Sequence, residues 1–196
     1  NLPLILTKGA DWFASLGAKN ATGTKIFALT GKTSHPCLVE APIGSTLADL
    51  MKMADGEGRG VEGELKAFQL GGPSGGIFPG RFQTTPMDFD SLANIGWKIG
   101  SGYVVLMDEK VCIVEMVRYI LNQFSSEACD RCQPCGKAFK NLLSILNRLV
   151  KGFGESGDLE TLEVFANRIQ SQARCDFGRA AVTPVLTSLR YFRSEY

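Results

Sequence analysis

The chain has one histidine, His35, and no apolar run near the roughly 18 residues that cross a membrane. Lys and Arg (21) barely outnumber Asp and Glu (20), whereas nucleic-acid-binding domains usually carry a basic excess. No nucleophile elbow or recognisable carboxylate pair supports hydrolytic catalysis. No secretory signal opens the chain at Asn1, which we interpret as a cleavage point or fragment boundary. These absences predict a cytoplasmic protein without nucleic-acid partners or direct membrane insertion.

A phosphate-binding glycine loop is also missing. The loop Gly71–Gly76 follows an expected strand, but it matches neither G-x-G-x-x-G nor a G-K-[ST] ending. Ile77-Phe78-Pro79 comes next, whereas a phosphate cradle needs a helix there. We therefore interpret this loop as structural.

Composition divides the chain. Its 196 residues are 44% apolar and 21% charged, which is typical of a globular protein. Most glycines and prolines precede Asp108, and five of the six cysteines follow it. We predict an N-terminal helical segment (1–22), a small mixed-sheet domain (23–107) and a helical domain (108–196), which together make an α+β protein.

The first two segments show short apolar patterns. A helix with Leu4, Ile5, Trp12 and Phe13 on its apolar face is expected to end at Gly17. A second helix is expected after an N-cap at Ser45 or Thr46. Expected strands cover 25–30, 38–41, 66–70 and 103–107.

The last segment is expected to form four helices, three of which show apolar residues at helical spacing. The expected buried stripes comprise Val111, Val114, Val117, Leu121 and Phe124; Phe139, Leu142, Leu143, Leu146, Leu149 and Val150; and Leu159, Leu162, Phe165 and Ile169. Asp158 is the expected cap of the third helix, and Thr183 before Pro184 the expected cap of the fourth.

Four cysteines form the most informative pattern. Cys129, Cys132 and Cys135 follow a C-x2-C-x2-C spacing, and Cys175 lies 40 positions later, in an expected loop between the third and fourth helices. A 4Fe–4S cube needs one thiolate for each of its four irons, and one tight loop can supply three of them. The spacing therefore predicts that these four residues ligate a 4Fe–4S cluster.

Three alternatives compete with the cluster. Structural zinc prefers two separated cysteine pairs or two Cys with two His, and a three-plus-one set of cysteines is uncommon for it. Disulfides need an oxidising compartment and would leave one of three adjacent thiols unpaired. Four buried cysteines acting as apolar fillers would not explain the spacing.

The neighbouring charges favour a cluster, which is negatively charged with four thiolates. Positive side chains near such a site favour thiolates and raise the reduction potential. The nearby cations are Arg131, Lys137, Arg174 and Arg179, and the nearby anions are Asp130 and Asp176. The alternative is that these are ordinary solvated surface charges.

Two cysteines lie outside the pattern. Cys112 is flanked by Val111 and Ile113, and we expect it to be a small buried residue on a helix. Cys37 begins an expected strand and is assigned no role.

Three stretches resemble the NADH-binding flavoprotein subunit of respiratory complex I and the related subunits of NAD-linked hydrogenases and formate dehydrogenases. That family carries E-S-C-G-x-C-x-P-C-R-x-G, then C-x-L-G, then L-R-Y-F-R-x-E-Y. The corresponding residues here are Glu127–Ala138, Cys175–Gly178 and Leu189–Tyr196. The stretches 23–32, 71–76 and 100–102 resemble the family's soluble-ligand-binding β-grasp domain. The resemblance implies a β-grasp domain followed by a helical 4Fe–4S domain.

The resemblance also implies a function. In the family, electrons pass from NADH to FMN and then through this cluster to further redox centres. The domain that binds FMN and NAD(H) precedes the β-grasp domain and has no counterpart in this chain, so whether the chain is itself an enzyme stays open. Expected partners are a 2Fe–2S thioredoxin-like subunit and a further iron–sulfur, hydrogenase or formate dehydrogenase subunit. The location would be cytoplasmic and peripheral to a membrane complex.

The chain departs from the family motif at four positions. Ala128, Asp130, Gly136 and Ala138 replace Ser, Gly, Arg and Gly, while all four cysteines remain. A carboxylate at Asp130 disfavours the added negative charge of a reduced cluster, so we expect it to lower the reduction potential. The alternative function is a docking module with a structural metal, zinc or iron, held by the same four cysteines.

Overall fold

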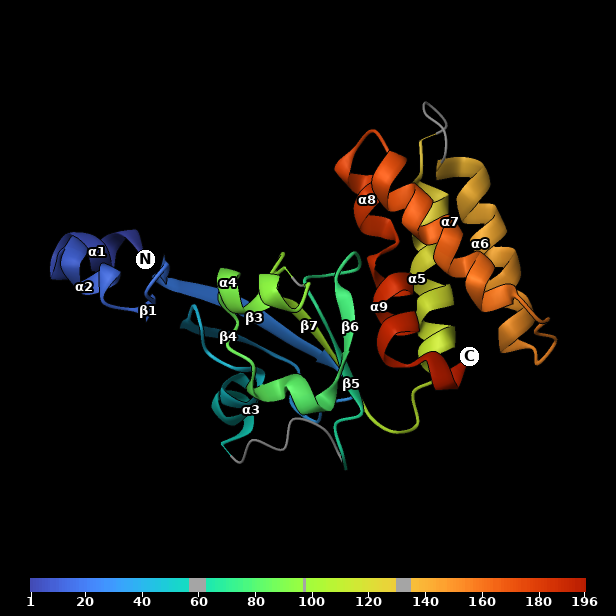
Figure 1. Ribbon diagram of the computed structural model, residues 1–196. Coiled ribbons are helices and arrows are strands. Elements are labelled where there is room, and N and C mark those ends of the chain that lie inside the picture. Colours follow the sequence, from blue (N-terminus) through green and yellow to red (C-terminus); the bar gives the residue numbers. More distant parts are fainter. Residues whose placement is uncertain (57–62, 97, 130–134) are drawn as a thin grey trace. The chain divides into compact units, whose positions relative to one another are not determined.

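A computed structural model describes residues 1–56, 63–96, 98–129 and 135–196 (Figure 1). The chain forms two compact units. The first contains 1–72 and 79–109, and the second contains 73–78 and 110–196. No helix of the described residues is long and apolar enough to span a membrane.

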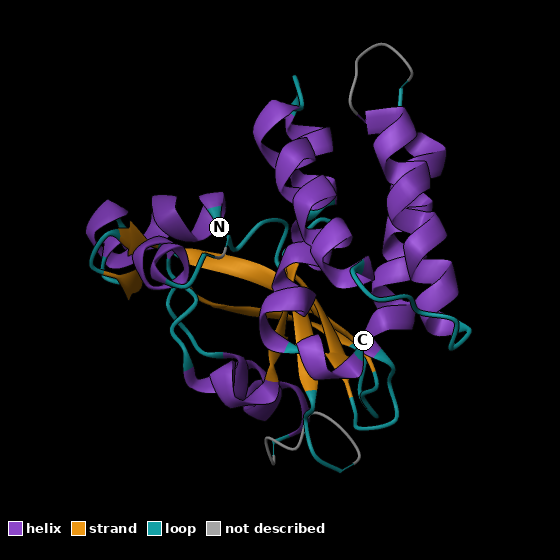
Figure 2. Ribbon diagram, turned by 45° about the vertical axis from the view of Figure 1, so that its right-hand side comes forward, coloured by secondary structure: helices purple, strands orange, loops and turns teal. Residues whose placement is uncertain are grey.

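A five-stranded mixed sheet is the centre of the N-terminal half (Figure 2). Its strand order is β4-β3-β7-β5-β6; β3 is antiparallel to β4 and parallel to β7, and β5 is antiparallel to β7. The strands are β3 (Thr24–Gly31), β4 (Cys37–Pro42), β5 (Ala67–Leu70), β6 (Gly76–Pro79) and β7 (Tyr103–Met107). The predicted α+β class is confirmed, and the predicted strands are present with small shifts at their ends.

Buried and exposed side chains alternate along β3 and β4, which shows that one face of these strands is covered. Phe27 and Leu29 of β3 are buried while Ile26 is exposed, and in β4 Val39 is buried while Leu38 is exposed. This period of two matches a sheet with one covered face along these two strands. The covered residues belong to the core of the sheet.

Helices complete this half. Helix α3 (Leu47–Asp55) begins at the predicted N-cap Thr46, whose side chain accepts from the Asp49 amide while Asp49 accepts from the Thr46 amide. This reciprocal pair is a capping box. The sequence prediction missed strand β6, the short helix α4 (Phe89–Asn94) and the 3₁₀ helix η1 (Gly80–Thr84), because each is too short to show a period.

The N-terminal segment differs from the prediction of one helix. Two helices, α1 (Leu2–Lys8) and α2 (Ala10–Ala14), meet at Gly9, whose φ of 94° is outside the helical range. A two-stranded pair follows, β1 (Gly17–Ala18) and β2 (Ala21–Thr22). None of the residues in α1 or α2 is buried, so the predicted apolar face is not part of the core.

Four helices of the second unit pack in a closed ring. Helix α5 (Ile113–Glu127) packs on α6 (Cys135–Val150), α6 on α7 (Asp158–Gln172), α7 on α9 (Thr183–Tyr191), and α9 on α5 (Figure 1). A fifth, short helix, α8 (Asp176–Ala181), packs on α7 and α9. The four predicted helices therefore exist, and α8 is an addition to them.

Several details of these helices correct the sequence analysis. Val111 and Cys112 precede α5, and Cys112 is an exposed N-cap residue rather than a buried one. Asp158 is the first residue of α7 and Gly157 its N-cap, whereas α9 has Val182 as N-cap. The predicted buried stripes are also too wide, because Leu143, Leu149, Val150, Leu159 and Phe165 are not fully buried.

The C-terminal residues tie the ring together. The Ile113 amide, at the free N-terminus of α5, donates to Glu195 Oε2 at 3.3 Å. Arg193 pairs with Glu160 and Glu163 of α7. The buried Tyr196 hydroxyl lies 2.5 Å from Ser188 Oγ, and burial raises the pKa of Tyr196 above its ordinary value. The stretch that resembles the family's last motif therefore stabilises the packing of the C-terminal residues against α5, α7 and α9.

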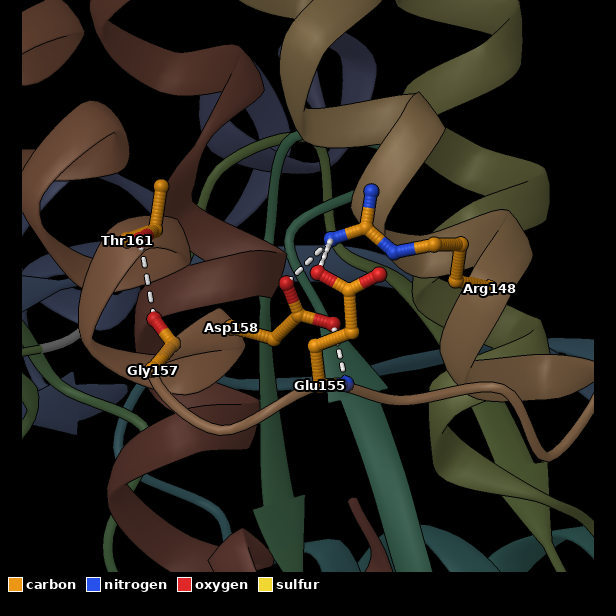
Figure 3. A network of polar contacts seen from close by, with 5 residues as sticks. All are labelled: Arg148, Glu155, Gly157, Asp158 and Thr161. Carbon is orange, nitrogen blue, oxygen red and sulfur yellow. Dashed lines mark hydrogen bonds and ion pairs between the residues drawn. The ribbon is translucent and has the colours of Figure 1, made fainter.

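An ion pair fastens the connection between α6 and α7 (Figure 3). The Arg148 guanidinium donates to the buried Asp158 carboxylate, which also accepts the Glu155 amide at 2.9 Å. Thr161 Oγ1 donates to the Gly157 carbonyl at 2.8 Å. Glu155 itself reaches Arg148 only at 4.0 Å and is 74% exposed. Asp158 is therefore the centre of this contact.

Asp158→Ala should destabilise the second unit by about 2 kcal/mol, because it leaves the Arg148 guanidinium and the Glu155 amide without their acceptor. Chemical denaturation followed by circular dichroism measures this. The matched control is Glu155→Ala, which should change the free energy of unfolding by less than about 0.5 kcal/mol. Equal losses in the two variants would contradict this interpretation.

Candidate metal centre

The first predicted ligand, Cys129, lies just beyond helix α5. The helix ends at Glu127, and the following Ala128 is extended, with φ −66° and ψ 128°. Cys129 is exposed. The end of α5 therefore delivers this thiol to the start of the connection to α6.

The third predicted ligand, Cys135, is the first residue of helix α6 and is buried, with 4% of its surface exposed. The second ligand, Cys132, lies outside the described residues, as do Asp130 and Arg131.

The fourth predicted ligand, Cys175, is the N-cap residue of helix α8 and is exposed. The sequence analysis placed it in a loop between the third and fourth predicted helices; Cys175 does lie outside a helix there, but the same connection also contains the unpredicted helix α8. Four residues later Arg179 closes the first helical turn, since its amide donates to the Cys175 carbonyl at 3.3 Å. Six residues are too few to give a readable apolar period, so α8 escaped prediction.

Two contacts bring the Cys175 segment to the other cysteines. The rings of Phe124 in α5 and Phe177 in α8 pack edge to face, with centroids 5.2 Å apart. A Cβ atom built on Gly178 of α8 would lie 2.6 Å from Cys135 Sγ and 2.9 Å from Ala173 Cβ. The Cys135 thiol therefore lies directly against the helix that Cys175 opens, and only glycine leaves room for it there.

The described residues alone do not assemble a full metal site. Among them, no three His, Cys, Asp or Glu side chains gather closely enough to hold an ion. No disulfide joins any two of the five described cysteines. Cys37 begins β4 in the sheet and Cys112 precedes α5, so neither belongs to the Cys135–Cys175 region.

The N-terminal end of helix α6 contributes positive charge to this region. Cys135 begins the 16-residue helix α6, whose N-terminal dipole end favours negative charge nearby. Lys137 lies in the first turn of α6, and Arg179 lies in the last turn of the short helix α8, where it pairs with Asp176. The residues present fit an iron–sulfur group, because they combine thiol donors with surroundings that favour an anion.

Comparison with known proteins agrees with this chemistry. A family model described as the NADH-ubiquinone oxidoreductase-F iron-sulfur binding region matches residues 115–196. The HndC component of the NADP-reducing hydrogenase of Solidesulfovibrio fructosivorans is 37% identical over 197 aligned residues, which cover 100% of this chain and 40% of that protein. The F component of the NADH-quinone oxidoreductase of Rickettsia felis is 36% identical, over 99% of this chain and 46% of that protein.

Residues 115–196 thus match the iron–sulfur binding region of the NADH oxidoreductase-F family, and the whole chain is homologous to members of that family. The chain corresponds to the C-terminal region of such a protein, and the matched region implies a 4Fe–4S cluster. A crystal structure of an NAD⁺-reducing [NiFe]-hydrogenase in the H2-reduced state superposes with a TM-score of 0.85 at 27% identity, covering 97% of this chain and 31% of the hydrogenase chain. The chain thus spans less than half the length of these relatives.

Sequence reasoning missed two residues of this region. Phe124 was assigned only to a buried stripe, and its contact with Phe177 depends on the tertiary fold. Gly178 was visible only as the last letter of the C-x-L-G resemblance. A glycine inside a helix is costly, and that cost is the one local signal that it fills a packing need.

Gly178→Ala should impair cluster binding, because the new methyl group overlaps the Cys135 sulfur and the Ala173 side chain. We expect the iron content after anaerobic reconstitution to fall by at least half. The control is Ala180→Ser, a similar enlargement at a half-buried position of the same helix, which should retain full iron content. Full iron content in Gly178→Ala would contradict the proposed packing.

Proposed function

We propose that this chain is an electron-transfer module in which Cys129, Cys132, Cys135 and Cys175 hold one 4Fe–4S cluster. The observation that carries the proposal is the contact of the Cys135 thiol with helix α8, which begins at Cys175. Residues 40 positions apart in sequence are thereby brought into one region. The remaining ligand, Cys132, comes from the same short motif as Cys129 and Cys135.

The donor set favours iron over zinc. All four proposed ligands are cysteines in a three-plus-one arrangement, whereas structural zinc usually takes paired cysteines or histidines. The only histidine, His35, lies in the first unit. The family match supports the same metal, because it implies a 4Fe–4S cluster.

Bound there, a cluster would accept and release one electron at a time. The chain's own residues would supply the thiolates, exclude water from the side of the cluster that faces the buried Cys135, and place positive charge near the site. Positive charge close to a cluster stabilises its reduced, more negative form. The N-terminal end of α6 and the side chains of Lys137 and Arg179 would act in this direction.

We place the module between a flavin and further iron–sulfur centres. Hydride transfer from NADH requires a two-electron acceptor such as FMN, and a cube that takes single electrons cannot fill that role. Electrons would therefore come from FMN in a flavin-binding part and leave to a 2Fe–2S thioredoxin-like subunit or another iron–sulfur, hydrogenase or formate dehydrogenase subunit. The names of the relatives, an NADP-reducing hydrogenase and an NADH-quinone oxidoreductase, support such an assembly.

Anaerobically reconstituted protein should contain about four irons and four sulfides per chain. Single Cys→Ser changes at the four proposed ligands should lower the iron content and the visible absorption. Cys37→Ser and Cys112→Ser are the matched controls and should leave both unchanged. A colourless protein with about one zinc per chain would instead support the docking module with a structural metal.

Dithionite should reduce the chain, whereas NADH should not, with or without added FMN. The physical reason is that no strand, glycine loop and helix unit for a dinucleotide is found among the described residues. Absorbance and electron paramagnetic resonance spectra recorded during anaerobic titration test this. Steady NADH-driven dye reduction by the isolated chain would overturn the expectation.

A further inference from the structure

The side chain of Arg179 turns back toward the segment that carries Cys175. Its Nε donates to the Ala173 carbonyl at 3.0 Å, and its Nη1 donates to Asp176 Oδ1 at 3.3 Å. Its own amide donates to the Cys175 carbonyl at 3.3 Å. One residue thus contacts the positions on both sides of Cys175 and Cys175 itself.

These contacts differ in strength. Asp176 is 99% exposed and Arg179 51% exposed, so their ion pair contributes little in water. The bond to Ala173 is different, because the donor is charged and Ala173 is only 2% exposed. The carbonyl of Ala173 is therefore the main anchor of the guanidinium.

Ala173 connects this anchor to the rest of the helical unit. It is the C-cap residue of α7, and its amide donates to the Ile169 carbonyl at 2.9 Å. Its Cβ atom lies on the side where Gly178 packs, next to the Cys135 sulfur. A guanidinium fixed to Ala173 therefore fixes the turn 173–176 between the end of α7 and the start of α8.

We propose that Arg179 is a positioning residue for the cluster, which holds the turn bearing Cys175 in place and adds a positive charge beside it. This inference rests on the proposed function, because it assumes that Cys175 ligates the cluster. Lysine would keep the charge but not the planar fork, which donates from Nε and Nη1 in fixed directions. The two contributions of Arg179 can therefore be separated by substitution.

Arg174 provides a matched control. It is adjacent to Cys175 and exposed, and no hydrogen bond or ion pair of its side chain is found within the part of the chain that the structure describes. Arg174→Gln also removes one positive charge close to Cys175 in the sequence, but it leaves the hydrogen bonds of the turn 173–176 in place. A purely electrostatic role would make Arg174 and Arg179 equivalent.

The test compares wild type, Arg179→Lys, Arg179→Gln and Arg174→Gln after anaerobic reconstitution. Iron loss to an excess of an iron chelator should be about tenfold faster in both Arg179 variants, as is typical when a supporting residue of a metal site is removed. Arg174→Gln should lose iron at the wild-type rate. Thermal melting of the iron-free proteins checks that each variant folds. If Arg179→Gln does not fold, Arg179→Lys still provides the comparison with wild type.

Redox titration followed by electron paramagnetic resonance gives the second measurement. Arg179→Gln should lower the midpoint potential, because the reduced cluster loses a neighbouring positive charge, and Arg179→Lys should restore it. The inference would be overturned if both Arg179 variants lost iron at the wild-type rate, or if Arg174→Gln lost iron as fast as the Arg179 variants. A wild-type protein that holds no iron would instead overturn the proposed function itself.

Discussion

The contact between the Cys135 sulfur and the α8 backbone at Gly178 is the constraint on which the candidate site depends. It joins the start of α6 to the start of α8, two segments separated by the whole of α7. A side chain at position 178 would overlap both the sulfur and Ala173, so close approach requires glycine. Because protein interiors are densely packed, an overlap of this kind is not absorbed without cost.

The remaining helices keep the two segments in reach of each other. Helix α6 runs from Cys135 to Arg148 and beyond, so the Arg148–Asp158 ion pair lies about 20 Å along the helix from the thiol. The C-terminal residues fasten α9 to α5 and α7 through Glu195 and Arg193. These contacts lie at a distance from the cysteines and hold together α5, α6, α7 and α9, the four helices of the unit that contains the proposed ligands Cys129, Cys135 and Cys175.

Charge and hydrogen bonding have separate roles in the candidate site. The N-terminus of α6, Lys137 and Arg179 contribute positive charge, which would stabilise a negatively charged cluster. Hydrogen bonds from Arg179 add order to the turn 173–176, which helix α8 alone is too short to impose. All four cysteines of the motif that the family resemblance implies are present in this chain, and in our proposal Arg179 and the turn 173–176 influence how tightly and at what potential a cluster is held.

Sequence by itself determined the fold class, four of the five strands of the main sheet and the four helices of the ring. Short apolar runs between turn residues marked the strands, helical spacing marked three of the helices, and Thr183 before Pro184 marked the fourth. Cysteine spacing also predicted the ligand set and its metal, and the family match supports a 4Fe–4S cluster. Only the tertiary structure revealed helix α8, the exposure of Cys112, and the contacts of Gly178, Phe124 and Arg179. These features depend on which distant segments pack together, and local propensity carries no information about contacts between segments far apart in the chain.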